Sequence, residues 1–474
     1  MKFNALHIHL CFTALLAAAC STSNPPLSLH PDNPHYFLFR GKPTVLVGST
    51  EHYGAVLNLD FDFIVYLDEL AANNLNVTRT FSGIYLEPSG AFGIEKNTLA
   101  PAEGKLICPW ARSEEPGYTN GGNKFDLDRW DEAYFKRLKE FIEEAGKRNI
   151  IVELDLFSNF YDTVQWKLSP LYIENNINQT GNFLNHKEVL SLKHQAILSV
   201  QEKMVRKIVE SLKEYDNLYY EVCNEPYFGD LEALEAWEQY MTGILADAEN
   251  DFRHKHLISQ NIANGSEKIE NPNSHVSIFN FHYATPPVTV GMNFNLDKAL
   301  GDNETGFKGI EDATYRKEAW NFMVAGGSLF DNLDYSFTVD EENGSFHVKE
   351  KQPGGGSSEL RKQLKILKAV LDEMDFIHMA PADSIIKSIL KENNNRVLAR
   401  EGEEYLIYMT HEGEKTVTCA IAPDLPEGDY TGEWIDTKTG DRKEINISNH
   451  PGGIKTLITP EFSEDIALKI TKKQ

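Results

Sequence analysis

The sequence predicts an α/β fold: a (β/α)8 barrel followed by a small antiparallel β-sandwich. Between residues 43 and 376, short apolar runs alternate with amphipathic helices, as in parallel strands joined by crossover helices. After Pro381 the helical pattern stops, and short apolar runs alternate with turn residues. A chain of 474 residues is long enough for one large domain and a smaller one.

Eight apolar runs are the predicted barrel strands, at residues 44–48, 76–81, 150–156, 218–224, 257–260, 276–283, 299–304 and 327–331. Helical patterns are predicted at residues 61–73, 131–148, 190–215, 237–248, 315–325 and 359–374. A polar insertion rich in Gly and Pro, residues 82–124, follows the second strand. A doubly wound sheet is the alternative fold, but no Gly-rich phosphate-binding loop follows the first strand. The strand and helix count therefore favours the barrel, also known as a TIM barrel.

The C-terminal region has the pattern of a sandwich. Short strands are predicted at residues 397–400, 404–409, 416–421, 432–435, 455–458 and 466–470. We therefore expect the barrel to occupy residues 30–378 and the sandwich residues 383–474.

The N-terminus has the features of a targeting segment. A basic Lys2 precedes an apolar stretch from Leu10 to Ala19, and small residues lead to Cys20. This pattern resembles a bacterial lipoprotein signal, which implies a signal peptide at residues 1–20, a lipidated Cys20 and a polar tether at residues 21–29. A plain secretory signal is the alternative. No acidic run follows Cys20, so we expect an anchor in the cell envelope that faces the periplasm rather than the cell surface.

Composition excludes several classes of partner and cofactor. The formal charge of −25 argues against nucleic acid, whose phosphates would be repelled. Beyond the signal, Cys108, Cys223 and Cys419 are scattered and form neither a disulfide framework nor a Cys-x-x-Cys pair. No His-Glu-x-x-His motif is present. We therefore expect no cofactor and no catalytic metal.

Two glutamates at predicted strand ends are the candidate catalytic groups. Glu225 ends the fourth strand within Asn224-Glu225-Pro226, and Glu304 ends the seventh. In a barrel of this kind, strand C-termini point into one site. Two carboxyl groups facing each other about 5 Å apart are the geometry of retaining glycoside hydrolysis. Glu304 would attack the anomeric carbon, and Glu225 would act as the acid/base.

Other polar residues near strand ends are predicted to serve this pair. Arg79 would keep Glu304 ionised, Tyr283 would hydrogen-bond it, and Asn224 would hold the sugar 2-hydroxyl. The remaining candidates for substrate binding are Glu51, His52, Asn159, Trp166, His282 and Asp331. Loop aromatics such as Trp110, Tyr161, Trp166 and Tyr227 can stack on sugar faces or act as packing anchors.

At these residues the chain resembles the clan A glycoside hydrolases, which include cellulase-like families. The motifs are Asn224-Glu225-Pro226 and residues 302–306 (DNETG), with support from Arg79, the His282-Tyr283 pair and residues 126–130 (DLDRW). The resemblance covers residues 30–378. It implies a retaining hydrolase that acts on an oligo- or polysaccharide. The C-terminal region resembles sandwich domains appended to such barrels, some of which are labelled collagen-binding.

One departure from the clan bears on substrate class. The eighth strand lacks the tryptophan that often forms the floor of the sugar site, so Phe330 or a loop residue would have to replace it. Two other functions stay open: a non-catalytic carbohydrate-binding barrel, and an adhesin acting through the sandwich. The sequence leaves sugar identity, linkage, oligomeric state and endo or exo action undetermined.

Overall fold

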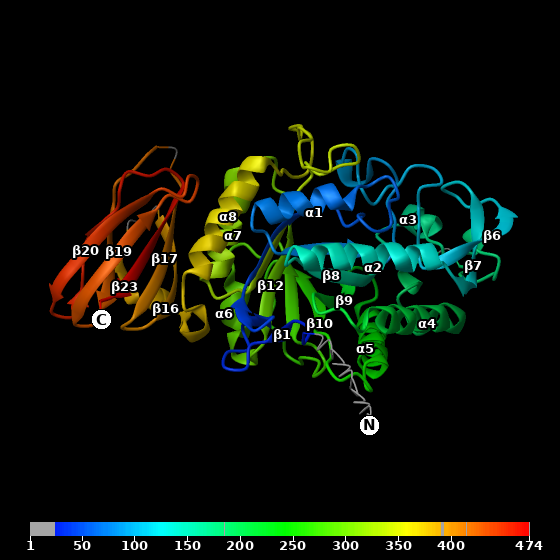
Figure 1. The fold of residues 1–474 in the computed structure, drawn as a ribbon, viewed down its shortest axis with the longest axis horizontal. Helices are drawn as coiled ribbons and strands as arrows, with labels where there is room; N and C mark the ends of the chain where they lie inside the picture. Colours follow the sequence, from blue (N-terminus) through cyan, green and yellow to red (C-terminus); the bar gives the residue numbers. More distant parts are fainter. Residues whose placement is uncertain (1–23, 184, 390–392, 414, 474) are drawn as a thin grey trace, which may run out of the picture.

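The computed structural model describes residues 24–183, 185–389, 393–413 and 415–473. Eight parallel strands form the central sheet: β4 (Leu46–Thr50), β5 (Val77–Phe81), β8 (Ile151–Ser158), β9 (Leu218–Asn224), β10 (Ile258–Asn264), β11 (Ile278–His282), β12 (Ala299–Thr305) and β13 (Leu329–Leu333). Their order is β4–β13–β12–β11–β10–β9–β8–β5, with each strand hydrogen-bonded to its neighbour. Figure 1 shows β8, β9, β10 and β12 of this sheet in the centre of the molecule. The predicted fold class, a barrel with a later antiparallel domain, is confirmed.

Asn76 closes the gap between β4 and β5, the two strands at the ends of the sheet order. Its backbone N–H donates to Val47 O at 3.1 Å. Its side chain accepts from Val47 N at 3.0 Å and donates to Val45 O at 2.9 Å. An open strand edge would expose unpaired backbone groups. One asparagine therefore links β4 to the start of β5 and brings the first strand next to the second.

Helices surround the barrel (Figure 1). They are α1 (Phe63–Ala72), α2 (Glu132–Lys147), α3 (Thr163–Leu168), α4 (Gln195–Leu212), α5 (Leu231–Ala248), α6 (Val288–Asn293), α7 (Asp312–Val324) and α8 (Ser358–Asp372). Aspartates begin several of them: the Asp131 carboxylate accepts from Ala133 N and Tyr134 N at the start of α2. Such caps satisfy N–H groups that have no partner within the helix.

A small antiparallel sheet packs against the N-terminal ends of the barrel strands. It consists of β1 (Ser28–Leu29), β2 (Phe37–Phe39) and β3 (Lys42–Thr44). Buried side chains from this segment form one cluster with residues that begin the strands: Leu27, Phe37, Phe39, Leu46, Val77, Ile151, Tyr219, Ile278, Ala299 and Leu329. Residues 27–29 are thus part of the folded domain, although the sequence assigned them to a tether.

The insertion after β5 contains a two-stranded sheet that the sequence pattern did not predict. Strands β6 (Trp110–Pro116) and β7 (Asn123–Trp130) pair antiparallel, and the rings of Trp110 and Trp130 stack with centroids 6.4 Å apart. Trp110 is fully buried. It is therefore a packing anchor and not a platform for a sugar.

The C-terminal region forms two antiparallel sheets with their own core. One has the order β14–β16–β17–β23–β19–β20, and the other contains β15, β18, β21 and β22. Their bounds are β14 (Ala380–Pro381), β15 (Ile386–Ser388), β16 (Asn393–Arg400), β17 (Glu404–His411), β18 (Ala420–Leu425), β19 (Gly428–Ile435), β20 (Arg442–His450), β21 (Gly453–Ile454), β22 (Leu457–Ile458) and β23 (Asp465–Lys472). Strand β20 had not been predicted.

Buried contacts fix the sandwich against α7; in Figure 1 the sandwich lies beside α7 and α8. The Arg316 guanidinium of α7 donates to the Asp465 carboxylate at 2.5 Å, and Tyr408 OH donates to the same carboxylate at 3.0 Å. The rings of Trp320 and Tyr408 stack with centroids 5.4 Å apart.

Within the described residues, no helix is both long and apolar enough to span a membrane.

Candidate active site

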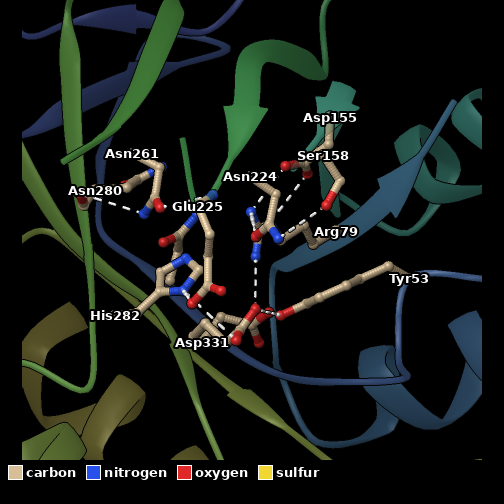
Figure 2. A network of polar contacts seen from close by, with 12 residues as sticks. Tyr53, Arg79, Asp155, Ser158, Asn224, Glu225, Asn261, Asn280, His282 and Asp331 are labelled. Atoms are coloured by element: carbon tan, nitrogen blue, oxygen red, sulfur yellow. Dashed lines mark hydrogen bonds and ion pairs between the residues drawn. The ribbon is translucent and has the colours of Figure 1, made fainter. Parts of the chain in front are cut away.

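The two candidate glutamates lie at the same end of the barrel. Asn224 is the last residue of β9, Glu225 follows it, and Glu304 is the next-to-last residue of β12. One carboxylate oxygen of each glutamate and a ring nitrogen of His282 all lie within 4.8 Å of one another. Figure 2 shows His282 beside Glu225, with Arg79 of β5 and Tyr53 of the turn after β4 on the other side of the view. The carboxylates are thus close enough for the retaining geometry, in which they lie about 5 Å apart.

Glu304 accepts three hydrogen bonds, and each donor comes from a different part of the barrel. Tyr53 OH donates to Oε2 at 2.7 Å, Arg79 Nη1 donates to Oε2 at 3.1 Å, and Tyr283 OH donates to Oε1 at 2.6 Å. The contacts expected of Arg79 and Tyr283 are present. Donors of this kind fix the orientation of a carboxylate. The arrangement suits a nucleophile.

Glu225 is held by a histidine and two tyrosines. His282 Nδ1 lies 3.0 Å from Oε1, Tyr227 OH donates to Oε1 at 3.2 Å, and Tyr161 OH donates to Oε2 at 2.6 Å. Burial raises the pKa of Glu225, but the contacts with His282, Tyr161 and Tyr227 outweigh burial and hold the pKa below its ordinary value. His282 Nδ1 also lies 3.5 Å from Glu304 Oε1, so this ring stands between the two carboxylates.

Arg79 supplies the positive charge beneath the pair. Its guanidinium is fully buried and donates to Asp155 at 2.8 Å and to Glu221 at 2.6 Å, besides Glu304. It also donates to Asn224 Oδ1 at 2.9 Å, which fixes that amide beside the cavity. Burial alone would lower the pKa of Arg79, but Asp155 and Glu221 outweigh it, so the pKa is raised and the group stays charged. Arg79 therefore already balances the charge of Asp155 and Glu221, carboxylates that could otherwise hold a cation.

Side chains at the strand ends enclose a cavity of about 310 Å³. Both candidate glutamates line it, together with His52, Asn224 and Tyr283. Aromatic rings make up most of the rest: Tyr53, Phe81, Tyr85, Phe92, Tyr161, Phe228 and Phe307. The cavity thus combines polar groups at the carboxylates with an apolar wall, as expected of a small-molecule site.

Several cavity residues had not been predicted from the sequence. Tyr85, Glu87 and Phe92 come from the insertion after β5, and Phe307 follows β12. Burial raises the pKa of Glu87 to about 7, while Asn97 and Tyr85 donate to its carboxylate. Tyr53 was also not predicted. Its position directly after Glu51 and His52, at the end of the first strand, was the one sequence signal that could have identified it as a cavity residue.

Arg79 and His282 contact the glutamates from behind the cavity wall, whereas four other predicted binding residues neither line the cavity nor hydrogen-bond the side chain of either glutamate. The fully buried Glu51 accepts from Gly54 N and Ala55 N, each at 2.9 Å, and so shapes the turn after β4. Asn159 donates to Glu225 O and Phe228 O at 3.2 and 2.8 Å and supports that loop. Asp331 accepts from Thr50 Oγ1 at 2.6 Å inside the barrel.

Trp166 is the fourth of these residues, and its expected stacking on a sugar does not fit the structure. Its ring is fully buried in α3, stacks on Phe183 with centroids 5.3 Å apart, and donates Nε1–H to Phe183 O at 2.9 Å. Trp166 is a packing residue. Phe330 is also fully buried in β13, so loop aromatics form the cavity wall where the eighth strand lacks a tryptophan.

Facing carboxylates at the C-terminal ends of barrel strands are an arrangement that this chain shares with the cellulase-like TIM barrels. Residues 108–328 match the model of the cellulase family, glycosyl hydrolase family 5. A comparison with curated proteins gives no match.

Solved structures share the fold over nearly the whole chain. One, a glycoside hydrolase, has a TM-score of 0.64 and 13% identity, with 95% of this chain and 98% of that chain covered. Another, a glycoside hydrolase family 5 protein from Bacteroides vulgatus ATCC 8482, has a TM-score of 0.63 and 12% identity, with 94% and 93% covered. The barrel and the appended antiparallel domain together are thus an architecture that such proteins share.

Proposed function

We propose that this chain is a retaining glycoside hydrolase that cleaves an oligosaccharide, polysaccharide or related glycoside by double displacement. The observation that carries the proposal is the proximity of Glu225 and Glu304, within 4.8 Å at the ends of β9 and β12. The match to the cellulase family over residues 108–328 supports it.

Glu304 would attack the anomeric carbon while Glu225 gives a proton to the leaving oxygen. A covalent glycosyl–Glu304 intermediate would form, and Glu225 would then take a proton from the attacking water. The free site favours ionised Glu225. A glycoside that fills the cavity would displace water, and desolvation favours the protonated carboxyl that the first step needs.

Azide rescue tests these roles. With an activated aryl glycoside, Glu225→Ala should keep the first step, and azide should restore turnover to a product of retained configuration. Glu304→Ala should lose the first step, and azide should yield the inverted glycosyl azide. Glu95→Ala is the control, because the Glu95 side chain is half exposed and lies outside the cavity. This variant should match wild type.

The products distinguish the alternatives. The opposite pattern of configurations would exchange the two roles. Wild-type activity in both glutamate variants would exclude the mechanism. A protein that binds glycans through the barrel without any turnover would be the non-catalytic alternative, and binding by the sandwich alone would indicate an adhesin.

We propose no metal in the reaction, because both steps use carboxylates. Activity should survive EDTA. Glu225, His282 and Glu304 have donor atoms close enough to hold an ion. Loss of turnover on chelation, restored by one divalent ion, would therefore indicate an ion at this cluster and contradict the proposal.

We also propose a lipid anchor at Cys20 that faces the periplasm. Cys20 and the rest of the signal lie outside the described residues, so this proposal depends on the sequence pattern. Cys20→Ser should move the protein from the membrane fraction to the soluble fraction without changing turnover. Protease added to whole cells should leave the wild type intact, whereas rapid digestion would place it on the cell surface.

A further inference from the structure

Two exposed phenylalanines stand over the acid side of the cavity. Phe92 and Phe228 are 46% and 43% exposed, and both line the cavity. Each meets the ring of Tyr161 edge-on, with centroids 5.5 and 5.6 Å apart. Exposed large apolar rings that converge from separate loops mark a binding surface more often than isolated ones do. We call these three residues the aromatic slot.

The aromatic slot lies where a leaving group would depart. Tyr161 OH donates to Glu225 Oε2 at 2.6 Å, so the tyrosine of the aromatic slot touches the carboxyl that would protonate the leaving oxygen. In double displacement the leaving group lies beside this acid. Phe92 and Phe228 are therefore placed to contact the aglycone, the part of the substrate beyond the cleaved bond.

The tyrosine hydroxyls beside the aromatic slot are already engaged. The Tyr161 hydroxyl oxygen also accepts from Asn224 Nδ2 at 3.2 Å. Tyr227 OH lies 2.6 Å from Asn264 Oδ1 and 3.2 Å from Glu225. The two phenylalanine side chains have no polar atoms. A sugar leaving group has several hydroxyls that lose water on binding, and a hydroxyl without a new partner costs free energy.

The nucleophile side of the cavity also has an exposed ring, Phe307, but it adds polar groups. His52 lines it, and His52 Nδ1 is buried without a hydrogen-bond partner in the described part of the chain. Burial lowers the pKa of His52 to about 4, so the ring is neutral at pH 7 and can bond a hydroxyl. Glu87, 3.8 Å from His52, and Tyr283, which donates to Glu304, line this side as well. Sugar recognition would therefore be concentrated on one side of the scissile bond.

From this asymmetry we infer that the leaving group carries an apolar part, an alkyl or aryl aglycone, in place of a second sugar. The inference rests on the proposed hydrolase function and deepens it. The aromatic slot would hold the apolar aglycone while the polar side holds the sugar. An apolar aglycone gains free energy from the rings and leaves no hydroxyl unpaired. A second sugar at the aromatic slot, as expected from the sequence, is the competing occupant.

A series of glycosides with one sugar and different leaving alcohols tests the inference. The sugar is one whose glycosyl fluoride is hydrolysed, because fluoride needs neither an aglycone contact nor a proton. From methyl to hexyl glycoside, kcat/KM should rise about fourfold for each CH2 that is buried. The hexyl and 2-phenylethyl glycosides should exceed the disaccharide of the same sugar. A preferred disaccharide, or a flat alkyl series, would overturn the inference while the hydrolase proposal stands.

Removal of the rings should abolish this preference. In the double variant Phe92→Ala, Phe228→Ala, the ratio of hexyl to methyl kcat/KM should fall towards one. Val288→Ala is the matched control, because Val288 is 44% exposed on α6 and does not line the cavity. It should keep the full ratio. An unchanged ratio in the double variant would contradict the assignment of the aromatic slot.

Direct binding tests the aromatic slot without turnover. Saturation-transfer NMR should show contact between 2-phenylethanol and the wild-type protein, and no contact for glycerol at the same concentration. The signal should persist in Val288→Ala and disappear in the double phenylalanine variant. Binding of the alcohol by a protein that hydrolyses no glycoside would support the slot and overturn the hydrolase proposal. Absence of binding, or binding that survives the double substitution, would overturn the slot.

Discussion

Removal of one hydroxyl at Tyr53 should slow the second step of the proposed reaction. Tyr53 OH donates to Glu304 Oε2 at 2.7 Å. Its ring stacks on Phe81 with centroids 4.9 Å apart and lies 4.6 Å from the Arg79 guanidinium carbon. Tyr53→Phe keeps both ring contacts. The substitution therefore removes one hydrogen bond to the nucleophile and little else.

The two steps depend on this bond in opposite ways. In the first step Glu304 loses its negative charge as it attacks, so a donor at its oxygen gives little help. In the second step the charge returns to Glu304 as the leaving carboxylate, and the donor stabilises it. A hydrogen bond to a charged group contributes about 1.5–3 kcal/mol, which corresponds to roughly 10- to 150-fold in rate. Because Tyr283 and Arg79 still donate to Glu304, we expect the lower end of this range.

Stopped-flow hydrolysis of an activated aryl glycoside measures both steps. Tyr53→Phe should retain a rapid burst of phenol equal to the enzyme concentration, followed by a steady state slowed about tenfold or more. Tyr335→Phe is the control, because the buried Tyr335 hydroxyl has no hydrogen-bond partner among the described residues. A burst slowed as much as the steady state, or an unchanged steady state, would refute the assignment of Tyr53 to the second step.

Three further substitutions test the electrostatics and the domain contact. His282→Gln should move the alkaline limb of kcat/KM to higher pH, because contacts led by His282 outweigh burial and hold the pKa of Glu225 down; an unmoved limb would contradict this. Burial raises the pKa of Glu238 from 4.5 to about 8, so its contribution to stability is present below pH 4.5 and is lost as the pH rises to about 8. Wild type should therefore lose unfolding free energy on the order of a few kcal/mol between pH 5 and pH 9, measured by urea unfolding, and Glu238→Gln should not show this loss. The same pH dependence in both proteins would contradict the role of Glu238. Arg316→Ala leaves Asp465 buried without its guanidinium and should lower the free energy of unfolding by about 3–5 kcal/mol; a loss below about 1 kcal/mol would show that the contact contributes little.

Local sequence signals were sufficient for the barrel and for the positions of the two glutamates at strand ends. Strands of a parallel sheet are buried on both faces and read as apolar runs, so the predicted fourth strand, residues 218–224, coincides with β9. The predicted eighth strand begins two residues before β13, because Gly327 and Ser328 belong to the turn from α7. Strand ends could be located this way because the chain changes from apolar to polar there.

Contacts across the barrel could not be predicted in the same way. Tyr53 and Glu304 are 251 residues apart, and Tyr161 and Glu225 are 64 apart, so no local pattern relates them. Trp166 illustrates the reverse error. A tryptophan in a polar segment suggested a sugar platform, but Phe183, 17 residues further on, covers it. The aromatic wall comes from the insertion and the strand-end loops, whose paths depend on turns that periodicity does not describe.

Backbone conformation connects the buried Glu51 with the proposed chemistry. Tyr53, Glu225 and Tyr283 have φ values of 61°, 50° and 55°, a left-handed region that costs non-glycine residues about 1–3 kcal/mol each. Such residues persist only where their surroundings hold them. Glu51 provides this at the first position: its carbonyl accepts from Tyr53 N at 2.8 Å, and its carboxylate accepts from Gly54 N at 2.9 Å. The turn that directs the Tyr53 hydroxyl towards Glu304 is therefore built by a glutamate that does not line the cavity. Glu51 follows the first strand because it supports this turn, and Tyr53 makes the contact with the proposed nucleophile.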